Sequence, residues 1–193
     1  MKKKIGITGG IASGKSVVAR ILSTIGYPVF NSDTVARELV NTDPDLKRQL
    51  IKLLGSNAYL KNKLNRKFVA DMVFNDQVLL AKLNALIHPA VRKVFDTWFD
   101  NQCEGLVFNE AAILFETDSY KLMDATILVL APEETRIQRA MKRDESNRED
   151  VLNRMNNQWP DEKKVSLADY VILNDEKHPV IKQLEKIISE LEN

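Results

Sequence analysis

The stretch GGIASGKS, residues 9–16, constrains this chain more than any other part of its sequence. It fits the pattern G-x-x-x-x-G-K-[ST], in which backbone N–H groups surround a phosphate and the N-terminus of a helix points at it. In that geometry the ammonium group of Lys15 reaches the β- and γ-phosphates, and the hydroxyl of Ser16 ligates Mg²⁺. The stretch therefore predicts a nucleoside triphosphate site near the start of the chain.

The residues on either side of this phosphate-binding loop (P-loop) match the strand and helix that it requires. Ile5 and Ile7 are typical of a buried strand. After the loop, apolar residues recur at helical spacing until Gly26, and Pro28 lies just beyond. These apolar residues are Val17, Val18, Ile21, Leu22 and Ile25. A strand, a loop and a helix in this order favour a true P-loop over a chance glycine-rich turn.

Composition places few further limits on function. The 193 residues, of which 44% are hydrophobic and 28% charged, fit one soluble domain with room for an inserted subdomain. A net charge of +1 gives no reason to expect a nucleic-acid partner. Cys103 is the single cysteine, which excludes an internal disulfide and suits a reducing compartment. With no apolar run of membrane-spanning length and no secretory signal pattern, we expect a cytoplasmic protein without a membrane partner.

Apolar stretches alternate with helical patterns along the chain, which predicts a parallel sheet with crossover helices. Beyond the strand before the P-loop, we expect strands at 27–33, 105–110, 125–131 and 169–175 and a last helix at 178–193. The predicted fold class is α/β, with a five-stranded parallel sheet flanked by helices.

The interval between the second and third expected strands is too long for a single crossover, and it carries four apolar stripes at helical spacing. Asp43 and Pro44 are typical of the N-cap and first residue of a helix that ends at Gly55. The other stripes begin at Phe68, Leu79 and Val91. We expect a helical subdomain that holds a second substrate.

Two carboxylates follow expected strands, at the edge where ligands of open α/β sheets bind. Asp33 follows the second strand, where it either lies near the P-loop or caps the next helix. Glu110 follows the third strand, where P-loop proteins keep an acidic residue that supports Mg²⁺, or it is a solvated charge. Position alone leaves both alternatives open for each residue.

The helix expected after the fourth strand carries three arginines, Arg136, Arg139 and Arg143. Arg139 and Arg143 share a face, and Arg148 follows in a polar segment that we expect to be mobile. Such arginines can form a solvated face, or they can close over phosphates and stabilise charge during transfer. We favour the second interpretation for Arg143, whereas Arg139 can pair with a carboxylate such as Glu134 or Asp144.

Seven short stretches together resemble one known family. They are GITGGIASGKS, NSDTVAREL, LNALIHPAVR, ILFE, RAMKRD, RMNNQ and ADYVILND, in this order and at fitting distances. They resemble the dephospho-CoA kinases, which use ATP to phosphorylate the ribose 3′-hydroxyl of dephospho-CoA in the last step of coenzyme A synthesis. The resemblance runs from Ile5 to about Asn174. The P-loop alone is shared with many ATPases and GTPases, but the combination is much more specific.

The resemblance implies a role for particular residues. Donor binding falls on Ala12, Ser13, Gly14, Lys15, Ser16 and Val17, with Asn174 near the adenine. Asp33 becomes the catalytic base, with Lys15 and Arg143 also catalytic, and His88 and Arg92 bind the acceptor. For His88 the plain alternative is a helix-terminal histidine before a proline.

The resulting prediction is a kinase with dephospho-CoA and ATP as its partners, ATP as phosphoryl donor, and Mg²⁺ held by Ser16 and Glu110. It forms a single domain over residues 1–193. The core comprises 1–33 and 105–193, the helical acceptor-binding insert is at about 34–104, and a small lid at about 139–158 carries Arg139 and Arg143.

Four positions depart from the usual family pattern. Ala12 stands where glycine is common, so we expect a negative φ there. Val17 replaces a frequent threonine, Asn31 a frequent aspartate, and Ala112 a frequent proline. None of these changes removes a group that the chemistry needs, so they bear on rate and affinity.

Two alternatives remain open on the sequence. One is another small-molecule P-loop kinase, acting on a nucleoside monophosphate or shikimate, against which the HPAVR stretch and the long helical segment argue. The other is a GTP-dependent switch, which usually carries N-K-x-D after a strand. Here NKLN at 62–65 lacks the aspartate and lies in the helical interval.

Overall fold

The computed structural model describes residues 2–74 and 76–193. The chain divides into two compact units. One, which we call the core unit, comprises Met1–Asn31 and Gln102–Asn193, and the other, the inserted unit, comprises Ser32–Asn101.

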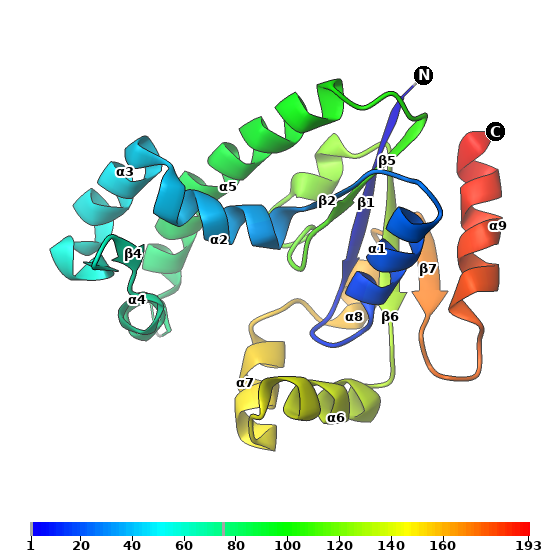
Figure 1. Ribbon diagram of the computed structural model, residues 1–193. Helices are drawn as coiled ribbons and strands as arrows, with labels where there is room; N and C mark the ends of the chain where they lie inside the picture. Colours follow the sequence, from blue (N-terminus) through cyan, green and yellow to red (C-terminus); the bar gives the residue numbers. More distant parts are fainter. Residues whose placement is uncertain (1, 75) are drawn as a thin grey trace. The chain divides into compact units, whose positions relative to one another are not determined.

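The core unit is built on a five-stranded sheet in the order β2-β5-β1-β6-β7, and all its paired strands are parallel. The strands are β1 (Lys3–Gly9), β2 (Val29–Asn31), β5 (Leu106–Glu110), β6 (Ala125–Leu130) and β7 (Tyr170–Leu173). The predicted α/β fold with five parallel strands is therefore confirmed. Because β1 is central and runs straight into the P-loop, the loop leaves the sheet at the carboxyl end of its middle strand (Figure 1).

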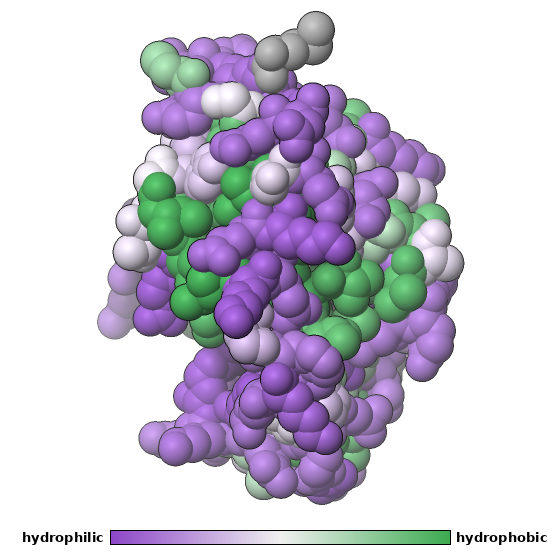
Figure 2. Space-filling view, turned by 90° about the vertical axis from the view of Figure 1, so that its right-hand side faces the viewer, coloured by the Kyte–Doolittle hydropathy of each residue, from purple (hydrophilic) through white to green (hydrophobic). Residues whose placement is uncertain are grey.

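Helices α1 and α9 bury one face of this sheet. Side chains of Ile5 and Ile7 meet Leu22 of α1 and Leu184 of α9 in one apolar cluster. In Figure 1, α9 lies beside β7, and the face on this side of the core unit is mostly hydrophilic in Figure 2. The helices of the core unit are α1 (Lys15–Thr24), α6 (Glu133–Asp144), α7 (Arg148–Asn156), α8 (Asp161–Val165) and α9 (Val180–Glu192), with a 3₁₀ turn, η2, at Ser119–Leu122.

The inserted unit is mainly helical, as its apolar stripes predicted. Asp43 caps α3 as expected, because its Oδ1 accepts the N–H groups of Asp45 (2.9 Å) and Leu46 (3.0 Å), and Gly55 ends the helix at φ 85°. The helices are α2 (Ser32–Thr42), α3 (Pro44–Leu54), α4 (Arg66–Val73) and α5 (Gln77–Asp100), and a 3₁₀ turn, η1, spans Ser56–Ala58. Their apolar faces enclose Val40, Leu46, Leu50, Leu54, Ala58, Val69 and Leu83.

One helix of the inserted unit is longer than the sequence suggested. The stripes that begin at Leu79 and Val91 belong to a single 24-residue helix, α5, which continues through Pro89. His88 therefore lies in the middle of a helix and not at its end. Proline costs one helix hydrogen bond, but burial of Leu83, Val91 and Phe95 on both sides of it keeps the helix continuous.

A short antiparallel hairpin in the inserted unit was not predicted. Its strands are β3 (Tyr59–Leu60) and β4 (Lys63–Leu64), joined by Lys61 and Asn62. Both joining residues have positive φ, 47° and 67°, as a type I′ turn requires. The NKLN stretch thus spans a turn and a strand and does not lie in a helix.

None of the helices in the described ranges combines the length and the apolarity that crossing a bilayer would require.

Candidate active site

The P-loop adopts the alternating backbone that turns several N–H groups to one side. Ala12 has φ 57° and Gly14 has φ 104°, both in the left-handed region, and α1 begins at Lys15 directly after them. Such alternation forms an anion-binding concavity at a helix N-terminus. The predicted negative φ at Ala12 is therefore wrong. The loop imposes the left-handed conformation even on a residue with a Cβ, at a cost of roughly 1–2 kcal/mol.

Gly14 is required both for its backbone angle and for close packing. A Cβ at this position would lie 2.0 Å from Nδ2 of Asn174, which leaves no room for it. The same Nδ2 donates a hydrogen bond to the carbonyl oxygen of Ser13 at 2.8 Å. The structure thus brings Asn174, which follows β7, into direct contact with the P-loop.

Glu110 lies beside the serine of the P-loop, at the end of the neighbouring strand. The hydroxyl of Ser16 donates to Oε1 of Glu110 at 2.7 Å, and Nδ2 of Asn31 donates to Oε2 at 2.6 Å. Glu110 is only 4% exposed, which excludes the alternative that it is a solvated charge at the end of a strand. Because β5 lies between β1 and β2, the parallel sheet brings these three side chains to one edge.

The Ser16–Glu110 pair fits the way in which proteins hold Mg²⁺. The ion takes oxygen ligands, commonly one or two from the protein and the rest from phosphates and water. One hydroxyl and one carboxylate 2.7 Å apart supply such a set. Residues 2–74 and 76–193 contain no cluster of three or more His, Cys, Asp or Glu side chains that could hold a metal without these other ligands.

Arg139 and Arg143 of α6 have different partners. Arg139 donates from Nη1 to the carbonyl oxygen of Asn174 (3.4 Å) and pairs through Nη2 with Glu176 (3.3 Å). Arg139 thus pairs with a carboxylate, as expected, but the carboxylate is that of Glu176 and not that of Glu134 or Asp144. Arg143 makes two bonds to Asp144, from Nε (2.8 Å) and Nη2 (3.0 Å).

Asp144 holds two arginines at once. Arg143 is bonded to both of its oxygens, and Arg154 of α7 donates to Oδ2 at 2.7 Å. Hydrogen bonds first from Arg143 and then from Arg154 hold the pKa of Asp144 well below its usual range. Asp144 is therefore ionised at neutral pH and links α6 to α7.

Arg148 was expected in a mobile polar segment, but it is the first residue of α7. Its two terminal nitrogens each donate to one oxygen of Glu134 at 2.8 Å. Hydrogen bonding from Arg148 lowers the pKa of Glu134. This pair forms a second link between α6 and α7.

The predicted acceptor residues lie within the inserted unit, where α2 packs on α5. Burial lowers the pKa of His88, the charge of Arg92 lowers it further, and the charge of Asp33 acts in the opposite direction. Arg92 and Asp33 thus each lie near enough to His88 for their charges to act on its ring. Asp33 is in the first turn of α2, which begins at Ser32, so it does not occupy the N-cap position that the sequence left open.

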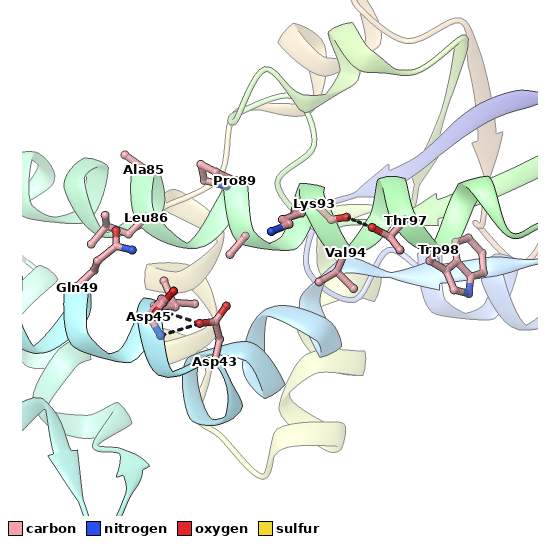
Figure 3. A pocket seen from close by; sticks show the side chains of 12 residues that line it. Asp43, Asp45, Gln49, Ala85, Leu86, Pro89, Lys93, Val94, Thr97 and Trp98 are labelled. Atoms are coloured by element: carbon pink, nitrogen blue, oxygen red, sulfur yellow. Dashed lines mark hydrogen bonds between the residues drawn. The ribbon is translucent and has the colours of Figure 1, made fainter.

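The inserted unit also contains a pocket of about 820 Å³ between the start of α3 and the second half of α5. Figure 3 shows Asp43 and Gln49 on one side and Pro89, Val94 and Trp98 on the other. Neither His88 nor Arg92 lines it. This pocket is therefore separate from the residues predicted to bind the acceptor.

Three polar side chains that contact the site region were not predicted as site residues. They are Asn31, bonded to Glu110; Gln158, whose Oε1 accepts from the N–H of Ile11; and Arg136, whose Nη1 lies 2.0 Å from where a Cβ on Gly10 would be. The sequence contained a weak signal for each: Asn31 begins the NSDTVAREL stretch, Arg136 is one of the three arginines of its helix, and the RMNNQ stretch ends at Gln158. Long-range contacts of this kind become visible only in the folded chain.

The central β1 strand, the P-loop, the helix after it and the carboxylate of Glu110 beside the loop serine define a P-loop protein of the small-molecule kinase type. Residues 3–179 match the family model described as "Dephospho-CoA kinase". The chain belongs to the dephospho-CoA kinase family, which confirms the resemblance seen in its motifs.

Relatives match over nearly their whole length. The chain is 38% identical over 190 residues to a dephospho-CoA kinase of Bacteroides fragilis, covering 98% of this chain and 93% of the relative. It is 43% identical over 189 residues to a dephospho-CoA kinase of Porphyromonas gingivalis, covering 95% and 92%. A crystal structure from Thermus thermophilus is 34% identical with a TM-score of 0.85, covering 98% of this chain and 96% of that one.

Proposed function

We propose that this protein transfers the γ-phosphoryl group of ATP to the ribose 3′-hydroxyl of dephospho-CoA, which yields coenzyme A and ADP. The match of residues 3–179 to the dephospho-CoA kinase family carries the proposal. The hydrogen bond between Ser16 and Glu110 supports it, because this pair is suited to the Mg²⁺ that accompanies ATP. Family membership favours this reaction over the other small-molecule kinases and over a GTP switch.

The donor half of the proposed site is the P-loop. Backbone N–H groups over residues 12–17 surround the phosphates, Lys15 reaches the β- and γ-phosphates, and Asn174 lies near the adenine. Ser16 and Glu110 would hold Mg²⁺, which neutralises phosphate charge when it is bound. The hydrogen bond from Asn174 to Ser13 is consistent with its place beside the loop.

The acceptor half is assigned to the inserted unit. Arg92 offers a guanidinium, the group best suited to the diphosphate of dephospho-CoA. Since burial and Arg92 both lower the pKa of His88, its imidazole is neutral at pH 7 and can donate or accept a hydrogen bond. The charge of Asp33 acts in the opposite direction on the pKa of His88, which is consistent with a position of the proposed base near the acceptor residues.

Asp33 is the proposed catalytic base. Its carboxylate accepts the proton of the 3′-hydroxyl and aims the oxygen at the γ-phosphorus. The new oxygen–phosphorus bond forms as the bond from the γ-phosphorus to the β–γ bridging oxygen breaks, and that oxygen leaves with ADP. Lys15 and Arg143 stabilise the charge on the transferring group.

The two other carboxylates considered for this role have partners already, on both oxygens of Glu110 and on one oxygen of Glu116. Glu110 accepts hydrogen bonds from Ser16 and Asn31. Oε1 of Glu116 accepts the N–H of Trp159 at 3.1 Å and lies 3.0 Å from Nζ of the buried Lys164. Asp33 is therefore the preferred base.

Residues at about 139–158, which include the second half of α6 and all of α7, are proposed as a lid that brings Arg139 and Arg143 to the phosphates. We also propose that the whole chain acts as one kinase domain in the cytoplasm, in keeping with its single cysteine.

The reaction itself is tested by incubating the protein with Mg·ATP and dephospho-CoA and measuring the product mass. The expected result is a gain of one phosphate, located on the ribose by fragmentation. AMP, CMP and shikimate in parallel reactions should gain much less. A dephospho-CoA sample whose mass does not change would exclude the proposed function.

The role of Asp33 is tested by Asp33→Asn, which removes the charge but keeps the shape. General-base contributions are typically ~10²–10⁴ in rate, so kcat should fall by about that factor. Asp45→Asn is the matched control, because Asp45 also lies in the first turn of a helix of the inserted unit. The thermal midpoint should change similarly in both variants, while only Asp33→Asn loses turnover. A lowered midpoint with near-normal kcat would make Asp33 structural.

A further inference from the structure

Gln158 connects the P-loop to two other parts of the core unit. Its Oε1 accepts the N–H of Ile11 at 2.8 Å, and its Nε2 donates to the carbonyl oxygen of Ala112 at 3.2 Å. Ala112 follows β5 by two residues, and Gln158 follows α7 by two residues. One amide side chain thus ties the loop to the exit of a strand and to the end of the lid helices.

The bond from Ile11 to Gln158 lies next to the strained residue of the loop. Ala12, the following residue, has φ 57°, which side chains with a Cβ adopt only when their surroundings hold them there. Ile11 and Ala12 also pack against an apolar cluster formed by Ile137, Ala140 and Val151 of α6 and α7. The conformation of the P-loop therefore depends on contacts from the segment 133–158.

Gln158 is itself held in place by its neighbours. The N–H of Trp159 donates to Oε1 of Glu116 at 3.1 Å, and Nζ of Lys164 lies 3.0 Å from the same oxygen. The side chain of Lys164 is only 1% exposed. A buried ammonium group far from any carboxylate is very unfavourable, so Lys164 stays beside Glu116. Together with the bond from Trp159, this contact holds residues 158–164 in one position.

We propose that Gln158 is a positioning residue for ATP, an inference that rests on the proposed function. By fixing the peptide N–H of Ile11, it keeps Ala12 in the left-handed conformation in which the following N–H groups converge on the phosphates. This hydrogen bond matters more here because position 12 is alanine, whereas a glycine would adopt the same φ without strain.

The chain offers a matched control in Gln183 of α9. Its Oε1 accepts the N–H of Leu173 at 2.9 Å and its Nε2 donates to the carbonyl oxygen of Leu173 at 3.0 Å. The same Nε2 also lies within hydrogen-bond distance of the carbonyl oxygens of His178 (3.3 Å) and Pro179 (3.5 Å). This glutamine thus also bridges backbone groups, but at the end of β7 and not on the P-loop. Replacing either glutamine by methionine preserves side-chain length and removes all of its amide hydrogen bonds.

The test measures the Kd for Mg·ATP by calorimetry on the full chain without acceptor. Gln158→Met should weaken binding about 3- to 10-fold, the effect of one net hydrogen bond. Gln183→Met should change the Kd less than about twofold, although both variants lower the thermal midpoint by similar amounts.

Ala12→Gly then separates positioning from a general structural role. Glycine removes the strain that Gln158 counteracts. Gln158→Met should therefore raise the Kd for Mg·ATP much less when it is added to Ala12→Gly than when it is made in the wild type. The effect of Gln183→Met on the Kd should be the same with and without Ala12→Gly. This non-additivity is what a double-mutant cycle measures.

The inference is overturned if Gln158→Met binds Mg·ATP like the wild type, if Gln183→Met weakens binding equally, or if Ala12→Gly does not reduce the effect of Gln158→Met. Should Gln158→Met not fold, Gln158→Asn replaces it, since its shorter amide cannot span both partners, and the same results are expected. Since the Kd is measured without dephospho-CoA, a protein that binds ATP but transfers no phosphate would refute the proposed function and leave this inference standing.

Discussion

The P-loop and Arg143 of α6 are held in opposite ways, although both are proposed to act on the same phosphates. The P-loop is surrounded by side chains that are buried or half-buried: Gln158 and Asn174 contact its backbone, and Glu110 contacts Ser16. The side chain of Arg143, by contrast, is 56% exposed and is bonded to Asp144, the next residue along the chain.

This contrast indicates that the donor site is built before ATP arrives, whereas Arg143 must exchange its partner to reach it. The Arg143 side chain is more than half exposed, and Arg154 keeps Asp144 partnered when Arg143 leaves it. Phosphate oxygens offer Arg143 the same two-bond geometry that the carboxylate does. The P-loop should therefore govern both binding and rate, while Arg143 should govern the rate more than the binding of either substrate.

Among the variants that test this comparison, Lys15→Ala has the largest expected effect, because it removes a charge from the preformed site. Loss of one such stabilising group typically lowers kcat by about 10²- to 10³-fold, and the fold should remain intact because the apolar core is untouched. Turnover and circular dichroism are measured together, with Lys142→Ala, on an exposed position of α6, as the control. Near-normal turnover of Lys15→Ala would show that the phosphates bind elsewhere.

Arg143→Ala tests the other side of the comparison. Loss of a charge-assisted contact made mainly in the transition state should lower kcat about 10- to 100-fold, with a smaller change in the KM for dephospho-CoA. Arg154→Ala is the matched control, because Arg154 also binds Asp144. If both variants lose stability equally and neither loses turnover, Arg143 belongs to a solvated ion-pair network.

Ser16→Ala sharpens the account of the P-loop. It removes one proposed Mg²⁺ ligand and the hydrogen bond to Glu110, so the Mg²⁺ concentration for half-maximal activity should rise about 3- to 10-fold. Activity at saturating Mg²⁺ should recover in large part. Ser23→Ala, on an exposed position of the same helix, should leave the Mg²⁺ titration unchanged. An unchanged titration for Ser16→Ala would exclude it as a ligand.

The smallest effect is expected from Arg148→Ala. This arginine pairs with Glu134 on the surface and has no proposed contact with phosphate, so kcat should change less than about twofold. High salt should reduce any difference further, since it screens exposed pairs. A loss of turnover as large as that of Arg143→Ala would mean that the link between α6 and α7 itself takes part in closing the lid.

Much of this protein was already determined by its sequence, because the relevant signals are local. The P-loop motif, the alternating apolar stretches and the caps at Asp43 and Gly55 act through residues a few positions apart. They predicted the parallel sheet, the start and end of α3 and the family, and the structure and the relatives confirm them. The roles assigned to Asp33, His88 and Arg92 stay predictions.

Only the tertiary structure decided the features that depend on distant parts of the chain. Ala12 is left-handed because the folded loop and its packing override the local preference of alanine. The helix α5 continues past Pro89 because burial on both sides outweighs one lost hydrogen bond. Arg139 binds Glu176, 37 positions away, and not the nearby carboxylates that local spacing favoured. In each case long-range packing competed with a local preference and prevailed, and that competition cannot be seen in a stretch of sequence.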